Sequence, residues 1–433
     1  MEKKSIGVGL MGLGVIGSQV ARVLLERAEV LAEQVGCPVV LRKVKVLEQD
    51  LSRPQAKEME PQLFTTDDNE FFTTPGVDIV IELIGGEEPA RQYQERALSA
   101  GKHVVTANKE VIAKYGVELM ALAQRQNVSL GYEAAVGGGI PLIAPFQRDL
   151  VANEIKVVYA IINGTTNYIL TQMSRGGTDF ASALAQAQRL GYAEADPRND
   201  IEGIDAAYKL AILASLAFQS QVKPDDIFRE GISHLESHDF RYAKEFGFAI
   251  KLLAIAKQSD GLIEVRVHPV FIPEDHFLAK VDGVYNAVLV EGDLCGSVTF
   301  LGMGAGALPT SSAIAADVVQ AARNIVFGAG YRTSWKLKLG RAIKPMSEIL
   351  TRYYIRMSIS DRAGVLAQIA GVLGEHNISI SSAIQKEADA LAQTAEIVIM
   401  THPAREKAMQ QAMKKLNHLE VVKVINSFVR VEV

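Results

Sequence analysis

The sequence contains little cysteine and no long uninterrupted run of apolar residues, and each absence excludes a class of protein. Cys37 and Cys295 are the two cysteines in 433 residues. They are too few for a cysteine metal cluster, and a disulfide between them is arithmetically possible but not expected. We interpret both as small apolar side chains in a core. No stretch reaches the roughly 18 apolar residues of a membrane-spanning helix, so we expect no membrane partner.

The chain also has no block of charge of one sign. Its formal net charge is −5, with acids and bases spread along the sequence, so we expect no nucleic-acid partner. The first residues, MEKKSIGVGLMGLGVIG, place a basic pair before apolar residues, but their glycines fit a strand and a tight turn better than a signal peptide. We therefore expect a globular, cytoplasmic protein. Its 48% hydrophobic residues are enough to fill the cores of about two to four domains.

What the sequence does contain, in its first third, is an alternation of apolar runs and helical segments. Five short apolar runs predict strands, at residues 5–10, 39–47, 77–84, 102–106 and 128–133. Helical periodicity predicts connecting helices at 18–33 and 89–100. This alternation is typical of α/β proteins and predicts a Rossmann-type, doubly wound parallel sheet.

The middle of the chain has a different texture, which begins at the three consecutive glycines of EAAVGGGIPLI, residues 133–143. Helices are predicted at 168–176, 181–190 and 205–218, and strands at 156–162, 263–269 and 287–291. This mixture predicts an α+β domain. A glycine-rich loop then leads into a predicted long helix at 309–327.

The last block begins with YYIRMSIS, in which Tyr353, Ile355, Met357 and Ile359 form one apolar face of a predicted strand. The elements predicted after it are helix 363–376, strands 378–384 and 394–401, helix 403–416 and strand 421–433. This β-α-β-β-α-β order predicts a ferredoxin-like domain. The predicted division is a dinucleotide-binding domain at 1–135 completed by 305–330, a second domain at 136–304, a linker at 331–350 and a C-terminal domain at 351–433.

The glycine loop GLGVIG follows a predicted strand and opens a predicted helix, which is the context that a dinucleotide-binding loop requires. Gly12 permits the tight turn, Gly14 lets a pyrophosphate approach the backbone, and Gly17 allows close packing of helix on strand. After the second strand, Glu48 and Asp50 favour NAD. Nearby bases favour NADP, namely Arg42, Lys43, Lys45, Arg53 and Lys57. The sequence leaves both cofactors open.

Three further groups of polar residues have either a functional or a purely structural interpretation. Asp205 and Lys209 are four residues apart on a predicted helix, and they form either a surface ion pair or part of a substrate site. Asn108 and Lys109 of TANKE follow a predicted strand, where they form either a helix cap with a surface lysine or part of a ligand site. Asp361 either caps a helix or belongs, with Gly364, to a turn that binds the carboxylate of a small ligand.

Together these motifs resemble homoserine dehydrogenase of the monofunctional bacterial kind, with a C-terminal ACT domain. The resemblance covers essentially the whole chain and rests on GLGVIG, GKHVVTANKE, GYEAAVGGGIP, NGTTNYIL, GYAEADPRNDIEGIDAAYKL and GMGAGALPTSS. It implies an NAD(P)-dependent oxidoreductase that interconverts L-homoserine and L-aspartate 4-semialdehyde on the route to threonine and methionine. It also implies a catalytic and dimerisation role for the α+β domain, in a homodimer or homotetramer. The alternatives are a dehydrogenase of another amino or hydroxy acid, and a non-catalytic sensor of cofactor and amino acid.

The resemblance also implies a role for each matching residue. Lys209 would be the catalytic proton donor or acceptor, with Lys109 as the second lysine beside the nicotinamide. The substrate-binding residues would be Glu194, Asp200, Asp205, Asn163, Gly164 and Thr165. Asp196 and Glu202 are expected to be solvated. The cofactor-binding residues would be Gly12, Leu13, Gly14, Val15, Ile16, Gly17, Ile84, Gly85, Thr106, Lys109 and Gly306.

An ion and an effector are implied in the same way. A structural sodium ion would be bound by Glu133, Val136, Gly138 and Ile140, chiefly through backbone carbonyl oxygens, which suit a hard cation. The ACT domain implies feedback inhibition by L-threonine, bound at Asp361, Gly364 and Asn377. One departure concerns the cofactor, because members of the family often have an arginine where this chain has Gln49. We favour NADP slightly and keep NAD open.

Overall fold

The computed structural model describes residues 3–328, 340–389 and 393–432. Part of the predicted linker at 331–350 lies outside these residues. The chain divides into two compact units, each built from several segments. Unit 1 comprises Met1–Ile155, Tyr208–Pro224 and Val290–Gly340, and unit 2 comprises Lys156–Ala207, Asp225–Leu289 and Arg341–Val433. The domain boundaries predicted from the sequence stay a prediction.

Unit 1 contains the predicted Rossmann-type sheet. Its six strands are parallel and lie in the order β3-β2-β1-β4-β5-β6. Their bounds are β1 Ile6–Met11, β2 Val39–Lys45, β3 Phe64–Thr65, β4 Ile79–Glu82, β5 His103–Thr106 and β6 Leu130–Gly131. The strand order reverses between β1 and β4, and ligands of such sheets bind at the carboxyl ends of the strands beside this point.

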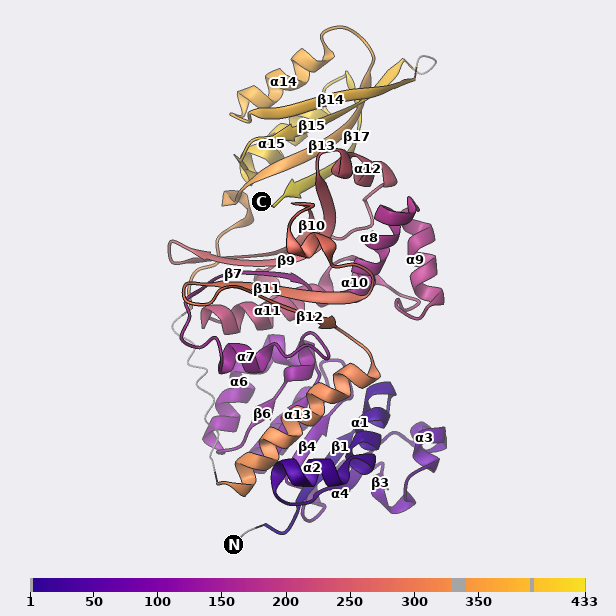
Figure 1. The fold of residues 1–433 in the computed structure, drawn as a ribbon, viewed down its shortest axis with the longest axis vertical. Helices are drawn as coiled ribbons and strands as arrows, with labels where there is room; N and C mark the ends of the chain where they lie inside the picture. Colours follow the sequence, from indigo (N-terminus) through magenta and orange to yellow (C-terminus); the bar gives the residue numbers. More distant parts are fainter. Residues whose placement is uncertain (1–2, 329–339, 390–392, 433) are drawn as a thin grey trace. The chain divides into compact units, whose positions relative to one another are not determined.

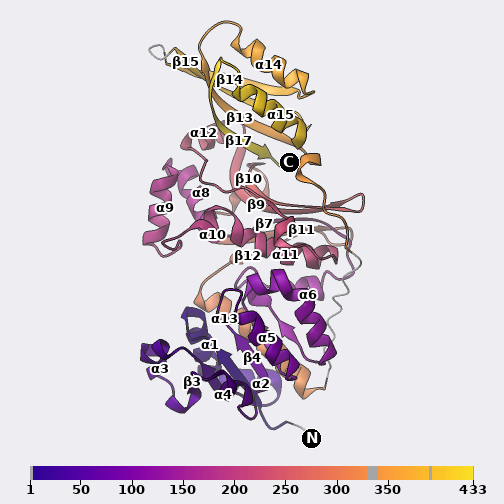
Figure 2. The same ribbon diagram turned by 180° about the vertical axis from the view of Figure 1, so that it is seen from behind.

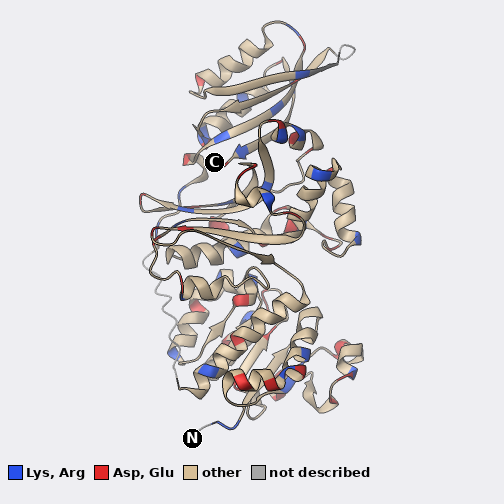
Figure 3. Cartoon of the chain, viewed as in Figure 1, with Lys and Arg blue, Asp and Glu red and all other residues tan. Residues whose placement is uncertain are grey.

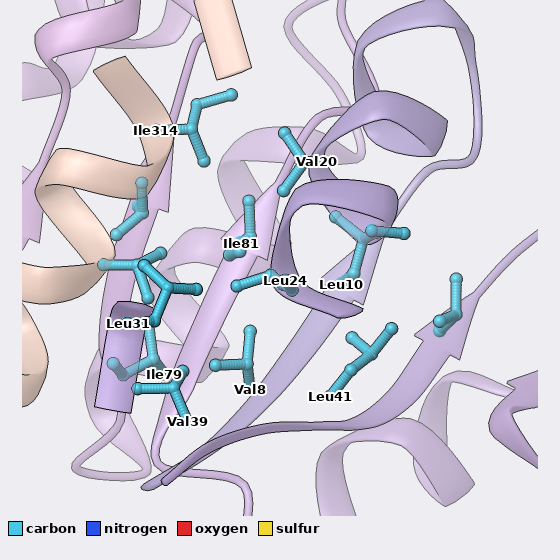
Figure 4. Packing of buried hydrophobic residues seen from close by; sticks show 14 of the residues in the cluster. Val8, Leu10, Val20, Leu24, Leu31, Val39, Leu41, Ile79, Ile81 and Ile314 are labelled. Carbon is cyan, nitrogen blue, oxygen red and sulfur yellow. The ribbon is translucent and has the colours of Figure 1, made fainter. Parts of the chain in front are cut away.

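Helices cover both faces of this sheet. The helices α1 Val15–Glu26, α2 Ala28–Val35 and α13 Ala307–Val326 cover one face (Figure 1), and α5 Ala90–Ser99 and α6 Lys109–Arg125 cover the other (Figure 2). Figure 4 shows the packing of the first face, where Val8 and Ile81 of the strands meet Leu24 of α1 and Ile314 of α13. The single helix predicted at 18–33 is two helices, because the backbone leaves the helical conformation at Arg27.

Several shorter elements complete unit 1. They are α3 Pro54–Lys57, α4 Asp68–Thr73, α7 Ile143–Gln147 and β12 Gly296–Met303. Cys37 and Cys295 are both free but only partly buried, so the expected full burial is wrong. Within the described residues, no helix combines the length and the apolar character needed to cross a membrane. Acidic and basic residues are interspersed along the elements of both units (Figure 3).

Unit 2 contains a mixed sheet, in the order β11-β7-β9-β10-β17-β13-β15-β14. The strand bounds are β7 Ile155–Ile161, β9 Phe248–Ser259, β10 Leu262–Pro273, β11 Tyr285–Gly292, β13 Leu350–Ser360, β14 Ile380–Asp389, β15 Thr394–Thr401 and β17 Val422–Val431, with the short strands β8 Phe228–Arg229 and β16 Ala404–Arg405 attached. The helices are α8 Gly164–Gly176, α9 Phe180–Arg189, α10 Arg198–Ile201, α12 Ser237–Glu245, α14 Val365–Glu375 and α15 Glu406–Asn417, and α11 Ile204–Phe218 crosses from unit 2 into unit 1.

The C-terminal block has the predicted ferredoxin-like order. Its strands lie as β17-β13-β15-β14, with α14 and α15 packed on them. The sequence did not predict that this sheet continues into the preceding one. Strand β17 pairs in parallel with β10, Val270 opposite Arg430, so both parts of unit 2 share one sheet. The sequence analysis also did not predict strand β9 or helix α12.

The second face of β13 is buried at Tyr354 and Arg356, although its alternation is typical of a strand with one apolar face. Arg356 is 1% exposed, and its guanidinium donates to Asp239 Oδ1 at 2.8 Å, Glu396 Oε2 at 2.9 Å and Glu236 Oε2 at 2.7 Å. Tyr354 also donates to Asp239, at 3.1 Å. A buried guanidinium without such partners would be strongly destabilising. Charged groups at the start of α12 and on β15 therefore bind a residue of the face that the pattern alone predicts to be polar.

Candidate active site

The glycine loop has the geometry that a dinucleotide requires. Gly12 has φ of +93°, and a Cβ there would lie 2.8 Å from the Leu83 carbonyl oxygen. A Cβ on Gly17 would lie 2.1 Å from the Gly12 oxygen, so helix α1 can approach the loop only with glycine there. Gly14 is different, because a Cβ there would meet nothing within 4 Å. Gly14 is the N-cap of α1 and makes no side-chain cap, and the bare helix N-terminus fits a pyrophosphate.

A buried acid organises the neighbouring strand ends. Glu82 is fully buried at the end of β4, where its carboxylate accepts from the Ile84 N–H at 2.7 Å, the Thr106 hydroxyl at 2.8 Å and the Gln94 amide at 2.7 Å. This fixes the predicted cofactor residues Ile84, Gly85 and Thr106 at one edge of the sheet. The sequence analysis missed Glu82 and Gln94. A single acid inside the apolar run VDIVIELIGG was the available signal.

The start of α6 is fixed by Asn108, which caps the helix. Its side chain accepts from the Val111 N–H at 3.1 Å and donates to the Gly86 carbonyl at 2.7 Å. The capping interpretation of Asn108 is therefore confirmed, while a surface role for Lys109 is not tested. Lys109 is the first residue of α6 and is partly buried.

The same turn of α6 lies beside α11 in unit 1. The Tyr208 hydroxyl donates to Glu110 Oε1 at 3.4 Å, and the Lys114 ammonium lies 5.7 Å from the centre of the Tyr208 ring. Hydrogen bonds to Glu110 and Glu87 raise the pKa of Lys114, so it is a fixed positive charge in this group. Glu110 and Tyr208 directly follow and precede the two predicted catalytic lysines, so these contacts bring the helix turns of Lys109 and Lys209 into one region.

Unit 2 brings three of the predicted substrate-binding residues together. Asn163 Nδ2 donates to Asp200 Oδ1 at 2.7 Å and to Asp205 Oδ2 at 2.9 Å. The Asn163 Oδ1 accepts from the Thr166 N–H at 2.9 Å and caps α8. Asp205 is 6% exposed, which excludes an exposed surface ion pair for this carboxylate. Residues far apart in sequence thus form one polar cluster, in which Asn163 and Asp205 are buried and Asp200 is partly buried.

The other predicted substrate residues surround this cluster. The Thr165 hydroxyl donates to the Tyr192 carbonyl at 2.6 Å, which holds the loop that carries the exposed Glu194 against α8. A Cβ on Gly164 would lie 2.8 Å from the Val284 carbonyl, so glycine is required by close packing. Asp196 and Glu202 are both exposed, in agreement with their expected solvation, and Asp196 forms an ion pair with Arg198 at 2.5 Å.

Helix α11 carries Asp205 and Lys209 one turn apart. The boundary between the two units falls inside this helix, after Ala207. Asp205 therefore lies in unit 2, with Asn163 and Asp200. Lys209 lies in unit 1, beside the start of α6. Helix α11 therefore carries one predicted substrate-binding residue and one predicted catalytic residue.

The glycine turn at 133–140 is buried and closely packed. The Glu133 carboxylate accepts from the N–H groups of Leu142 at 2.5 Å, Ile143 at 2.8 Å and Ala144 at 2.8 Å, so its side chain organises the turn before α7. A Cβ on Gly138 would lie 2.6 Å from the Gly304 backbone. Two glycine-rich segments therefore meet backbone to backbone, and the second continues into Gly306, the N-cap of α13 with φ of +117°.

The part of the chain that the structure describes has no group of three or more histidine, cysteine, aspartate or glutamate side chains arranged to hold a metal. The Glu133 side chain is occupied by backbone donors. A cation in this turn would therefore use backbone carbonyl oxygens, which is the chemistry of a hard, weakly bound ion.

In the C-terminal block, the capping interpretation of Asp361 is wrong. The N-cap of α14 is Gly364, with φ of +85° and no side-chain cap. Asn377, after the end of this helix, also has a positive φ of 57°, a conformation that asparagine tolerates better than most residues. The turn before α14 therefore presents a helix N-terminus without a side-chain cap, which fits a carboxylate.

The chain matches three family descriptions along its length. These are "Homoserine dehydrogenase, NAD binding domain" at residues 12–133, "Homoserine dehydrogenase" at 141–319 and "ACT domain" at 353–421. It is 42% identical to the homoserine dehydrogenase of Neisseria gonorrhoeae over 99% of both chains.

Solved structures show the same similarity. A homoserine dehydrogenase from Thiobacillus denitrificans has a TM-score of 0.92 at 41% identity, over 100% of this chain and 99% of that one. A hyperthermophilic archaeal homoserine dehydrogenase in complex with NADPH has a TM-score of 0.63 at 26% identity, over 73% of this chain and 97% of that one.

The open space at Gly14 gives a direct test of the dinucleotide site. Gly14→Val should raise the KM for the dinucleotide by at least about tenfold, because the new side chain occupies the approach of the pyrophosphate. The unfolding midpoint should stay close to the wild-type value, since no atom beyond the adjoining residues lies within 4 Å of the new Cβ. The control is Gly371→Val in α14, where a Cβ also meets nothing. Equal KM values for the two variants would contradict the assignment.

Proposed function

The chain belongs to the homoserine dehydrogenase family, and from this premise we propose that it interconverts L-homoserine and L-aspartate 4-semialdehyde. It is an NAD(P)-dependent oxidoreductase that acts on a CH–OH group. The observation that carries the proposal is the helix α11. It joins Asp205, in the buried cluster with Asn163 and Asp200, to Lys209, one helical turn away.

The cofactor fits the residues that are present. Gly12, Gly14 and Gly17 leave the backbone of the loop and the N-terminus of α1 open to a pyrophosphate. The nicotinamide, when bound, supplies or accepts the hydride. The strand ends at Ile84, Gly85 and Thr106, held by Glu82, form the neighbouring surface of the same sheet edge. Leu13, Val15, Ile16 and Gly306 complete the proposed cofactor contacts.

We assign the proton transfer to Lys209. In the direction of aldehyde reduction, negative charge develops on the substrate oxygen, and an ammonium group can neutralise the charge and donate the proton. In the oxidation, the neutral amine accepts that proton. Lys109, at the first turn of α6, supplies a second positive charge in the same region, next to the helix N-terminus.

Substrate binding is assigned to unit 2. The carboxylates of Glu194 and Asp205 suit the ammonium group of an amino acid, and Asp200 supports the site through Asn163. Gly164 and Thr165, at the start of α8, complete the pocket. Both N–H groups of Asn163 Nδ2 are already bonded to the Asp200 and Asp205 carboxylates, so we assign this amide group to holding the two acids rather than to binding substrate.

The structure supports NADP as the preferred cofactor through Arg53. Its guanidinium donates to the Leu13 carbonyl of the glycine loop at 3.2 Å. Asp50, the acid that would favour NAD, is buried, pairs with Arg53 at 2.8 Å and accepts from the Leu47 N–H. Lys43 and Lys45 pair elsewhere, with Glu70 and Asp68. Arg53 is therefore the base that we assign to the 2′-phosphate.

The proposal also covers feedback regulation, a bound sodium ion and the oligomeric state. The ACT domain is proposed to bind L-threonine at Asp361, Gly364 and Asn377, and so to inhibit the enzyme. A sodium ion is proposed to bind the backbone carbonyls of Glu133, Val136, Gly138 and Ile140. A homodimer or homotetramer, a cytoplasmic location and the four-part domain division are retained as proposals.

The test of this function is an initial-rate assay with L-homoserine. Rates are measured with NAD⁺ and NADP⁺ separately, with and without L-threonine, and with sodium replaced by a bulky organic cation. We expect homoserine-dependent reduction, faster with NADP⁺, inhibited by threonine and lowered without sodium. No homoserine-dependent reduction with either cofactor would refute the proposed function. The comparison of the two cofactors, the effect of threonine and the effect of sodium then decide cofactor preference, regulation and the bound ion, respectively.

Lys209→Ala should lower kcat by about 10²- to 10⁴-fold, the usual contribution of a positioned general acid or base. Binding of the reduced cofactor, measured by its fluorescence, should stay close to the wild-type value. Lys244→Ala, on an exposed turn of α12, serves as the control for loss of a lysine charge. If Lys209→Ala retains near-normal kcat, the role assigned to this lysine is wrong.

Arg53→Ala should lower kcat/KM for NADP⁺ by about 10- to 100-fold, since it removes a charge-assisted hydrogen bond to the 2′-phosphate. The value for NAD⁺ should change little. Lys57→Ala, at the end of the exposed helix α3, is the control for a nearby positive charge. An equal loss with both cofactors would mean that Arg53 supports the loop and does not select NADP.

A further inference from the structure

The last strand of the chain is bonded to both parts of unit 2. Strand β17 pairs antiparallel with β13 of the ACT domain and parallel with β10 of the preceding sheet. The Glu432 N–H, just beyond its end, donates to the Phe271 carbonyl at 2.9 Å. The end of β17 therefore cannot shift along β10 without breaking backbone hydrogen bonds.

Glu432 extends this attachment into the sheet that carries the substrate-binding residues. Its carboxylate accepts from the Tyr159 hydroxyl at 3.0 Å and from Arg266 at 2.6 Å, and it pairs with Lys257. The Glu432 side chain is 8% exposed and that of Arg266 is 1% exposed. Burial alone would raise the pKa of Glu432, but Arg266 and Lys257 hold it below the ordinary value. The group is ionised and bonded in a buried setting, where few alternative arrangements satisfy every partner.

Tyr159 connects Glu432 to the buried cluster of the proposed substrate site. It lies on β7, which ends at Ile161, and Asn163 follows two residues later as the N-cap of α8. Asn163 in turn donates to Asp200 and Asp205. Tyr159 therefore lies on the strand that leads directly into the amide that holds both carboxylates.

A second connection runs from Arg430 to the same cluster. The Arg430 guanidinium binds Glu406 of the ACT domain at 2.6 Å and 2.9 Å, and Glu230 of the preceding part at 2.8 Å. Two residues after Glu230, the Ile232 N–H donates to the Ile201 carbonyl at 2.9 Å. Ile201 directly follows Asp200. A Cβ on Gly231 would lie 2.4 Å from the Ile201 oxygen, so the two segments are in direct backbone contact.

We propose that Arg430 and Glu432 are positioning residues for the dehydrogenase reaction. Through Glu230 and Tyr159 they hold Asp200 and Asn163 in the geometry that binds the amino-acid substrate. The end of β17 is then the element through which a ligand of the ACT domain changes substrate affinity. This inference rests on the proposed function, because it takes Asn163, Asp200 and Asp205 as the substrate site.

The test compares two Tyr→Phe variants that each lose one tyrosine–carboxylate hydrogen bond. Tyr159→Phe removes the bond to Glu432, and the control Tyr93→Phe removes the bond from Tyr93 to Asp68, 2.7 Å long, in unit 1. Both tyrosines are partly buried. Tyr159→Phe should raise the KM for homoserine by about three- to tenfold, a size typical of residues that couple sites without touching either ligand. Its KM for the cofactor should stay unchanged, and Tyr93→Phe should leave the KM for homoserine unchanged.

Glu432→Gln is the second variant. It should raise the KM for homoserine in the same direction and weaken threonine inhibition. Direct binding of threonine, measured by calorimetry, should persist, since Glu432 lies outside the proposed effector turn. If this variant fails to fold, Tyr159→Phe decides alone. Wild-type KM values for homoserine in every folded variant would overturn the inference. A wild-type enzyme that threonine does not inhibit would refute the proposed regulation instead, and the KM comparison would still decide the positioning role.

Discussion

The arrangement of the proposed substrate-binding residues depends on one amide group. Two carboxylates, Asp200 and Asp205, approach the same point in a partly buried setting, where their mutual repulsion would separate them. The two N–H groups of Asn163 Nδ2 bind one carboxylate each, and its Oδ1 caps helix α8. A single side chain thus fixes two acids and the start of a helix. Every other feature proposed for substrate binding is arranged around this bridge.

The same principle, buried charge satisfied by several partners, joins the ACT domain to the preceding part of unit 2. Arg356, Arg430 and Glu432 are buried and each has at least two bonded partners. Such groups contribute little net stability compared with apolar replacements, but breaking one of them is costly because it leaves a buried charge unpaired. The shared sheet and these charges make the ACT domain a continuous part of unit 2.

The cofactor side follows a different constraint, namely close approach of backbone to backbone. At Gly12, Gly17 and Gly138 any side chain would collide with a carbonyl or with another segment, whereas Gly14 leaves space free. Helix α13, which is remote in sequence, packs on the same sheet as α1. The close packing of these segments therefore requires glycine for the fold as much as for ligand binding.

The sequence by itself determined the features that depend on local chemistry. Period-two and helical patterns predicted the parallel sheet and the ferredoxin-like block, and the glycine spacing with its strand–helix context predicted the dinucleotide loop. These succeeded because backbone conformation and amphipathicity are encoded within a few residues. Only the tertiary structure decided which partners the buried polar groups have. Glu82 beneath the strand ends, Asn163 between two acids, and Glu432 with Tyr159 and Arg266 are contacts between distant segments. A periodic pattern cannot predict such contacts, because they depend on which distant segments pack against each other.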